Sequence, residues 1–248
     1  MTGNASAVPG PLGAQAAPPV IDKGTAARES SPLPCVIGTD PPPAVASPKP
    51  PPAIDDDTRI LAATVYGEGS TANVFEEMAA IANVLVRQQK ARGYVSISAF
   101  IRADRTFAFA AHDGSARFGK LMAAKDEDIA RDTGMDAAVK GARNALSPSP
   151  VDHSNGAYFW DGLDIKTDYA RHPKVLGGIH ITDPAHNVVG IKDNVVEGEN
   201  WLLDAKGNKT RSRGKWQYKY ESTAGFGATI FWKYNPAFVK ASGNREYK

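Results

Sequence analysis

The chain has almost no cysteine, and it has no aromatic residue in its first quarter. Cys35 is the single cysteine, which excludes disulfides within the chain and zinc clusters built from cysteine. No Phe, Trp or Tyr precedes Tyr66, whereas 13 of the 18 prolines fall within residues 1–57. A segment of this composition cannot bury enough apolar surface to fold, so we expect residues 1–54 to form a disordered, Pro- and Ala-rich leader. Residues 55–248 are then the folded domain.

Long apolar runs are also absent. Met1–Ala17 offers neither the basic start nor the apolar stretch of a secretory signal peptide. No run approaches the roughly 18 apolar residues that a membrane-spanning helix requires. We therefore expect a chain without a membrane span that is made in the cytoplasm without a signal peptide. A substrate outside the cytoplasm would have to be reached by a non-classical delivery route.

Charge is distributed unevenly behind a net charge of +2. Residues 1–57 carry 3 basic and 6 acidic side chains, whereas residues 192–248 carry 11 basic and 6 acidic ones. The cationic C-terminal region could attract nucleic acid, anionic lipid or an anionic wall polymer, and charge alone does not choose among them. Because no nucleic-acid-binding motif accompanies the charge, we expect no nucleic-acid partner.

Hydrophobic periodicity predicts an α+β fold with its helices first. Apolar residues recur at helical spacing in four segments, which are the predicted helices: residues 58–68, 72–91, 97–101 and 133–146. The aromatic run Gly156–Trp160 suits a strand or a segment that lines a cleft. Three short β-prone segments predict a small C-terminal antiparallel sheet: residues 201–203, 216–220 and 229–234.

Glu68 is the residue whose position has the clearest chemical meaning. Leu61 and Val65 stand at i and i+4 of a helical stripe, and Glu68 falls at i+7, so its carboxyl group is predicted to point inward. Gly67 and Gly69 flank it and let a polymer chain approach the backbone. Partial burial would raise the pKa of such a group and keep it protonated for use as a general acid. The alternative is a helix-terminal glutamate that is hydrogen-bonded to a neighbouring turn.

The residues around Glu68 resemble the opening of a known family. Leu61–Glu68 ends in Tyr-Gly-Glu, and the Ala- and Val-rich stretch Glu76–Arg87 follows it. This order is similar to the start of the SleB-like cell-wall hydrolase family, in which a Tyr-Gly-Glu motif precedes an Ala/Val-rich helix that ends in Asn-Arg or a close variant. Here Asn83 and Arg87 have a compatible but not identical spacing.

Three later segments extend the resemblance over most of residues 58–235. Residues 107–113 resemble the family's aromatic segment, and residues 136–160 resemble its helix followed by Gly-Ala-Tyr. Residues 225–231 resemble its closing strand, with Thr in place of the usual His. Residues 162–220 have no counterpart in this pattern and are interpreted as an insertion.

The resemblance implies a lysozyme-like fold that cleaves the glycan backbone of bacterial peptidoglycan, with Glu68 as the catalytic acid and with no cofactor or metal. Two reactions stay open. A hydrolase (muramidase) would add a second carboxylate, for which Asp113 and Asp161 are candidates because they flank the aromatic segments. A lytic transglycosylase needs only the one acid/base, because the 6-hydroxyl of the muramic acid attacks within the sugar. We favour the single-glutamate reaction and expect Glu76 and Glu77 to be solvated residues on a helix face.

Aromatic and polar side chains near the motif are the expected substrate contacts. Aromatic rings can stack on sugar faces, and polar groups can bind hydroxyl or N-acetyl groups. The candidates are Tyr66, Phe107, Phe109, His112, Asn155, Tyr158 and Trp160. The alternative role of these residues is packing in the core.

Two other functions stay open. A zinc-dependent peptidoglycan amidase could use His180, Asp183 and His186, although Pro184 argues against a shared helix. A non-catalytic module that binds wall polymer or nucleic acid could use the cationic region around residues 200–240.

The expected partner is peptidoglycan, and the expected place of action is the periplasm or cell wall. A wall-degrading enzyme without a signal peptide can belong to one of two classes. It is either an antibacterial effector, which is a toxin that a delivery apparatus injects into a rival cell, or it is a phage-type endolysin. We favour the effector. An effector also implies a cognate immunity protein that inhibits it by covering the cleft.

Overall fold

The computed structural model describes residues 52–248. The predicted leader, except for its last three residues, and Cys35 lie outside the described residues. At the start of the folded part, the carboxylate of Asp55 accepts a hydrogen bond of 2.9 Å from the backbone N–H of Thr58. This contact caps the first helix, because it satisfies a backbone donor that has no partner within the helix.

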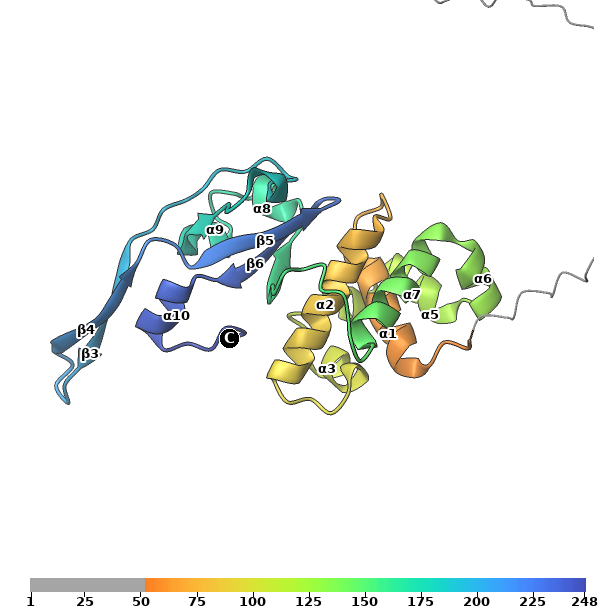
Figure 1. Ribbon diagram of the computed structural model, residues 1–248, viewed down its shortest axis with the longest axis horizontal. Coiled ribbons are helices and arrows are strands. Elements are labelled where there is room, and N and C mark those ends of the chain that lie inside the picture. Colours follow the sequence, from red (N-terminus) through yellow and green to blue (C-terminus); the bar gives the residue numbers. More distant parts are fainter. Residues whose placement is uncertain (1–51) are drawn as a thin grey trace, which may run out of the picture. The chain divides into compact units, whose positions relative to one another are not determined.

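Helices α1 to α7 come first along the described chain (Figure 1). Their bounds are α1 Asp56–Glu68, α2 Phe75–Ala91, α3 Ile97–Ala103, α4 Phe109–His112, α5 Ala116–Ala123, α6 Asp126–Arg131 and α7 Thr133–Leu146. The four predicted helices are confirmed as α1, α2, α3 and α7, with small shifts at their ends. The sequence did not predict α4 to α6, which are short helices of 4 to 8 residues.

Helices α1, α2 and α7 pack against one another and form the main core. Leu61 and Val65 of α1 and Met78 of α2 are fully buried there. A Cβ atom at Gly141 of α7 would lie 3.1 Å from the backbone of Ala79. The glycine therefore allows α7 to approach α2 more closely than a larger residue would.

The strands and the remaining helices follow. Their bounds are β1 Phe159–Asp161, α8 Asp164–Thr167, α9 Pro173–Gly177, β2 Ile179–His180, the 3-10 helix η1 Pro184–His186, β3 Gly198–Leu203, β4 Lys209–Trp216, β5 Tyr220–Phe226, β6 Thr229–Tyr234 and α10 Pro236–Ser242. The main sheet has the order β1-β6-β5-β2, in which β6 is antiparallel to β1 and β5 and β2 is parallel to β5. Strands β3 and β4 form a separate antiparallel hairpin (Figure 1) that packs on α10.

The predicted α+β class is confirmed, but the predicted single C-terminal sheet is wrong in two respects. Residues 201–203 belong to the β3–β4 hairpin and not to the main sheet. Residues 216–220 are not one strand, because they contain the end of β4, a link and the start of β5. Alternation of apolar residues indicates that a segment is a strand but does not say which strand it pairs with.

Strand β6 is buried on both faces. Phe231 packs into the helical core, whereas Ile230 and Trp232 point the other way into a second apolar cluster, and all three side chains are fully buried. Successive side chains of a strand alternate between its faces, so one strand serves both clusters. Because β1 pairs with β6 from Phe159 to Asp161, the position of β6 also determines where these residues lie.

Glu77 corrects one prediction from the sequence. Glu76 is exposed as expected, but the side chain of Glu77 is fully buried. Its Oε2 accepts hydrogen bonds from the backbone N–H (3.1 Å) and hydroxyl (2.5 Å) of Ser70. Its Oε1 accepts from the backbone N–H of Ala228 (3.2 Å) and the hydroxyl of Thr229 (2.7 Å). The carboxylate thus joins α2 to the turn between β5 and β6.

Within residues 52–248, no helix combines the length and the apolar character needed to cross a membrane.

Replacing Glu77 should destabilise the fold strongly. In Glu77→Ala the donors of Ser70, Ala228 and Thr229 lose their acceptor inside the protein, and we expect the free energy of unfolding to fall by about 3 kcal/mol. Urea unfolding followed by circular dichroism measures this change. The matched control is Glu76→Ala at the neighbouring exposed position, with an expected change below about 0.5 kcal/mol. Equal effects of the two substitutions would contradict the structural role of Glu77.

Candidate active site

Glu68 is the last residue of α1, and its side chain faces the start of α4. Its Oε1 accepts a hydrogen bond of 2.6 Å from the backbone N–H of Ala110. A Cβ atom at Gly67 would lie 2.6 Å from the Cβ of Ala110, which is too close for any real contact. A glycine at position 67 is therefore what lets α4 come near enough to donate this hydrogen bond.

The surroundings of Glu68 favour its protonated form. Burial raises the pKa of the carboxyl group, and this effect exceeds the opposing effect of the Ala110 N–H, which lowers it. The C-terminal end of α1 carries partial negative charge, which also disfavours a carboxylate at this position. By contrast, the hydrogen bond from Lys120 lowers the pKa of Asp132. Glu68 therefore keeps its proton to a higher pH than an exposed glutamate does.

Glu68 lines a pocket with a volume of about 220 Å³. The pocket is lined by Glu68, Thr106, Phe107, Phe109, Phe159, Trp160, Asp161 and Lys174. Four of these residues are aromatic, so the acidic group stands beside flat apolar walls. Such walls and a few polar groups are typical of sites that bind sugars or other small ligands.

The aromatic wall has a buried part and an exposed edge. The ring centroid of Phe107 lies 6.1 Å from those of both Phe159 and Trp160, and the guanidinium of Arg92 lies 4.8 Å from the Phe107 ring centroid. Phe107 is nearly buried by these neighbours, whereas Phe109 is 61% exposed. Phe109 is therefore free to contact a ligand at the mouth of the pocket.

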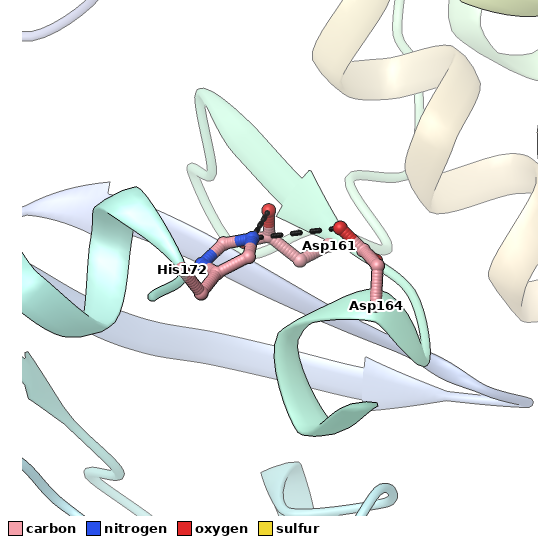
Figure 2. Close-up of side chains that lie close together, drawn as sticks. All are labelled: Asp161, Asp164 and His172. Carbon is pink, nitrogen blue, oxygen red and sulfur yellow. Dashed lines mark ion pairs between the residues drawn. The ribbon is translucent and has the colours of Figure 1, made fainter. Parts of the chain in front are cut away.

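Asp161 brings a second carboxylate into the pocket. Figure 2 shows it beside two of its neighbours, Asp164 and His172. Oδ1 of Asp161 accepts a hydrogen bond of 2.7 Å from Nζ of Lys174. The Nε2 atom of His172 lies 3.4 Å from Oδ1 of Asp161 and 3.4 Å from Oδ2 of Asp164. Contact with the Asp161 carboxylate raises the pKa of His172, although burial acts in the opposite direction.

The structure brings five of the predicted site residues into one pocket: Glu68, Phe107, Phe109, Trp160 and Asp161. The aromatic segment and the aromatic run, which lie about 50 residues apart in sequence, thus meet beside the glutamate. Asp113 does not join them, because it is exposed after the end of α4.

Two predicted substrate contacts face away from this pocket. Tyr66 is buried beneath Arg117, whose guanidinium lies 4.0 Å from the ring centroid. Residues 66 and 68 of a helix differ by about 200° in direction, so both cannot point into one pocket. His112 donates from Nε2 to the carbonyl oxygen of Ile101 over 2.7 Å.

Two further predicted contacts lie elsewhere on the chain. Asn155 is exposed in a turn with a φ of 49° and donates from Nδ2 to the carbonyl oxygen of Thr223 over 3.0 Å. Tyr158 lines a different hollow, of about 420 Å³, together with Arg87 and Asp152. There burial of Asp152 is outweighed by hydrogen bonds that lower its pKa, so this carboxylate is a poor proton donor.

The sequence analysis missed several residues of the pocket and of its edge. Thr106 and Phe159 lie next to residues that were predicted, so proximity to the aromatic segments would have included them. Asp164, His172 and Lys174 fall in the segment interpreted as an insertion. No periodic pattern or motif marks these three, and only the folded chain brings them to Asp161.

The predicted zinc set for an amidase does not assemble. His180 Nδ1 pairs with Oδ2 of Asp193 at 2.6 Å, and His186 Nδ1 lies 3.0 Å from Oγ of Ser222. Within residues 52–248, the only group of three or more side chains with the spacing of metal ligands is Asp161, Asp164 and His172. A metal-dependent reaction at His180 and His186 therefore has no support from the geometry.

Compared with protein-family models, curated proteins and solved structures, the chain matches none of them. The resemblance to SleB-like hydrolases thus depends on the sequence motifs alone. The chemistry of the pocket has to be inferred from its own geometry.

Glu68→Gln should stabilise the protein at neutral pH. The folded-state pKa of Glu68 is raised above 4.5, so stability is lost as the pH rises through the folded-state pKa and the buried group ionises. Glutamine has no charge to bury and can still accept the Ala110 hydrogen bond. We expect a higher melting temperature than wild type at neutral pH and no difference well below pH 4.5. Glu76→Gln is the exposed control; a melting temperature of Glu68→Gln below that of wild type at neutral pH would contradict the assignment.

Proposed function

We propose that this protein cleaves the glycan strands of bacterial peptidoglycan, with Glu68 as the catalytic acid. The observation that carries the proposal is a carboxyl group with a raised pKa at the wall of an aromatic-lined pocket. The Tyr-Gly-Glu motif around it, which resembles that of SleB-like cell-wall hydrolases, supports the same assignment. A lysozyme-like fold for residues 55–248 is part of this proposal.

The pocket supplies what glycosidic cleavage requires from an acid. A protonated carboxyl group can donate its proton to the oxygen that leaves the sugar, and a raised pKa keeps that proton available near neutrality. Phe109 and Trp160 offer flat surfaces on which sugar rings can stack. The Phe109 side chain is largely exposed, so a ligand can reach its ring from solvent.

The charge around Asp161 favours the single-glutamate reaction. Asp161 is the second carboxylate of the pocket, but Lys174 already pairs with it at 2.7 Å. A carboxylate whose charge is compensated in this way is a weak partner for the positive charge that develops on the sugar. We therefore favour a lytic transglycosylase. In that reaction Glu68 first protonates the leaving oxygen and then accepts the proton of the 6-hydroxyl as its oxygen bonds to C1, which yields a 1,6-anhydro end.

The substrate determines where the protein acts. Peptidoglycan lies outside the cytoplasmic membrane, so we propose action in the periplasm or cell wall after delivery by a route other than general secretion. An antibacterial effector with an immunity protein that covers the Glu68 pocket is the setting that we favour. Lysis on periplasmic expression, but not on cytoplasmic expression, is the corresponding observation in cells.

Glu68→Gln should abolish digestion of purified peptidoglycan. The substitution removes the proton donor at nearly constant shape, so we expect the rate to fall at least about 100-fold. Mass spectrometry of the released fragments measures this loss, and Glu76→Gln is the matched control that should digest like wild type. Disaccharide-peptides with anhydro ends support the transglycosylase, whereas reducing ends indicate a hydrolase and move Asp161 into the reaction.

Free stem peptides, or equal digestion by Glu68→Gln and wild type, would overturn the proposed function. The first result indicates an amidase. The second indicates that Glu68 takes no part in the chemistry. Absence of digestion by wild type, with retained binding to the wall polymer, would instead favour a binding module that uses the exposed basic residues of β4.

Phe109→Ala should weaken substrate binding without harming the fold. The side chain is 61% exposed, so little core packing is lost, but one stacking surface disappears from the mouth of the pocket. Loss of roughly 1 kcal/mol of stacking corresponds to an increase of about fivefold in KM with kcat nearly unchanged. Steady-state kinetics on solubilised glycan strands measures this. Leu176→Ala, at a side chain that is 60% exposed and outside the pocket, should leave KM as it is.

A further inference from the structure

We propose that Asp161, Asp164 and His172 form a binding site for one divalent transition-metal ion, such as Zn²⁺ or Mn²⁺, at the edge of the Glu68 pocket (Figure 2). The three side chains come from separate elements. Asp161 ends β1, Asp164 begins α8, and His172 precedes α9. The proposal is independent of the glycan-cleaving reaction, because it concerns what these side chains bind and not what Glu68 does.

The distances fit a shared ion better than direct hydrogen bonds. His172 Nε2 lies 3.4 Å from an oxygen of Asp161 and 3.4 Å from an oxygen of Asp164. Hydrogen bonds between such atoms are about 2.7 to 3.2 Å long. Two ligand atoms that each lie about 2.1 Å from one ion, at a tetrahedral angle, are about 3.4 Å apart. One atom from each of the three side chains lies within 4.8 Å of the others, which leaves room for the ion between them.

A buried atom without a partner is the second observation. Among the contacts of residues 52–248, Oδ2 of Asp161 is shielded from solvent and has no hydrogen-bond partner, and the side chain that carries it is only 8% exposed. Buried carboxylate oxygens normally accept hydrogen bonds or bind a cation, because an unpaired one costs free energy. Lys174 serves only Oδ1 of this group. The carboxylate thus retains one unused acceptor, Oδ2, while its other oxygen, Oδ1, is the one that lies 3.4 Å from Nε2 of His172.

The charge of the group leaves room for a cation. When His172 is neutral, as a metal ligand has to be, Asp161 and Asp164 together carry two negative charges, and Lys174 supplies one positive charge near Oδ1 of Asp161. A divalent ion on the side of His172 and Asp164 would compensate the remaining charge. One imidazole and two carboxylates are a ligand set for Zn²⁺ or Mn²⁺, whereas Ca²⁺ and Mg²⁺ prefer oxygen ligands throughout.

An ion at this position would fix one wall of the pocket. Asp161 and Lys174 both line the pocket, and the ion would tie Asp161 to α8 and to the residue before α9. The side of the pocket opposite to the helices would then keep its shape when a ligand enters. It would also engage Asp161 as a ligand, which agrees with a reaction that uses Glu68 alone.

The test is titration of the tag-free full chain, first treated with a chelator, with Zn²⁺ and Mn²⁺, and with Mg²⁺ for comparison. Calorimetry should give one strong site per chain for the transition metals, and the melting temperature should rise on binding. Asp164→Asn should weaken binding at least about tenfold. The Asp164 side chain is 66% exposed, so the variant should fold normally. Asp168→Asn is the matched control, because this nearby carboxylate pairs with Arg171 outside the group.

Two results would overturn the site: no saturable binding of either transition metal to wild type, or equal binding by Asp164→Asn and Asp168→Asn. The second result would mean that other side chains hold the ion. Glu68→Gln separates this proposal from the glycan-cleaving one, because it should bind the metal like wild type whether or not it digests peptidoglycan.

Discussion

The buried carboxylate of Glu77 is the contact on which the arrangement of the pocket depends. The side chain projects from α2 into the interior of the protein. There its carboxylate accepts hydrogen bonds from the loop at Ser70 on one side and from Ala228 and Thr229 on the other. A buried carboxylate that is satisfied from several directions has few alternative positions, because each displacement leaves a donor without an acceptor. The turn between β5 and β6 is thereby held against the end of α1 where Glu68 lies.

The rest of the site follows from this connection through strand pairing. The turn sets the position of β6, and β6 sets that of β1 through the register of Phe159 with Trp232 and of Asp161 with Ile230. Glu68 comes from the helices and Asp161 from the sheet, yet both reach one pocket. The pocket therefore depends on contacts between segments about 90 residues apart in sequence and not on a local motif.

The sequence predicted those parts of the fold in which apolar residues recur at regular spacing within one helix. The stripe of Leu61, Val65 and Glu68 predicted that the glutamate points inward, and the longer helices were predicted for the same reason. Periodicity did not predict the burial of a side chain whose contacts lie on a distant segment of the chain. Glu77 is next to the exposed Glu76, and only the turn at residues 228–229 makes it a buried acceptor.

The same limit applies within the candidate site. Tyr66 stands two residues before Glu68 in the motif, but a helix places the two side chains on nearly opposite sides. His172 and Lys174 belong to a segment with short helices and a strand of two residues, which has no pattern to read. Their place beside Asp161 is a property of the packed chain alone.

The close contact between Gly67 and Ala110 has a consequence for how the acid could be altered. Any side chain at position 67 would push α4 away from α1, because its Cβ would overlap that of Ala110. The N–H of Ala110 would then no longer reach Glu68, and the cover that shields the carboxyl group from water would loosen at the same time. The proton affinity of Glu68 thus depends on the small size of its neighbour in the chain. The Gly of Tyr-Gly-Glu is therefore needed to set the pKa of the acid that the Glu supplies.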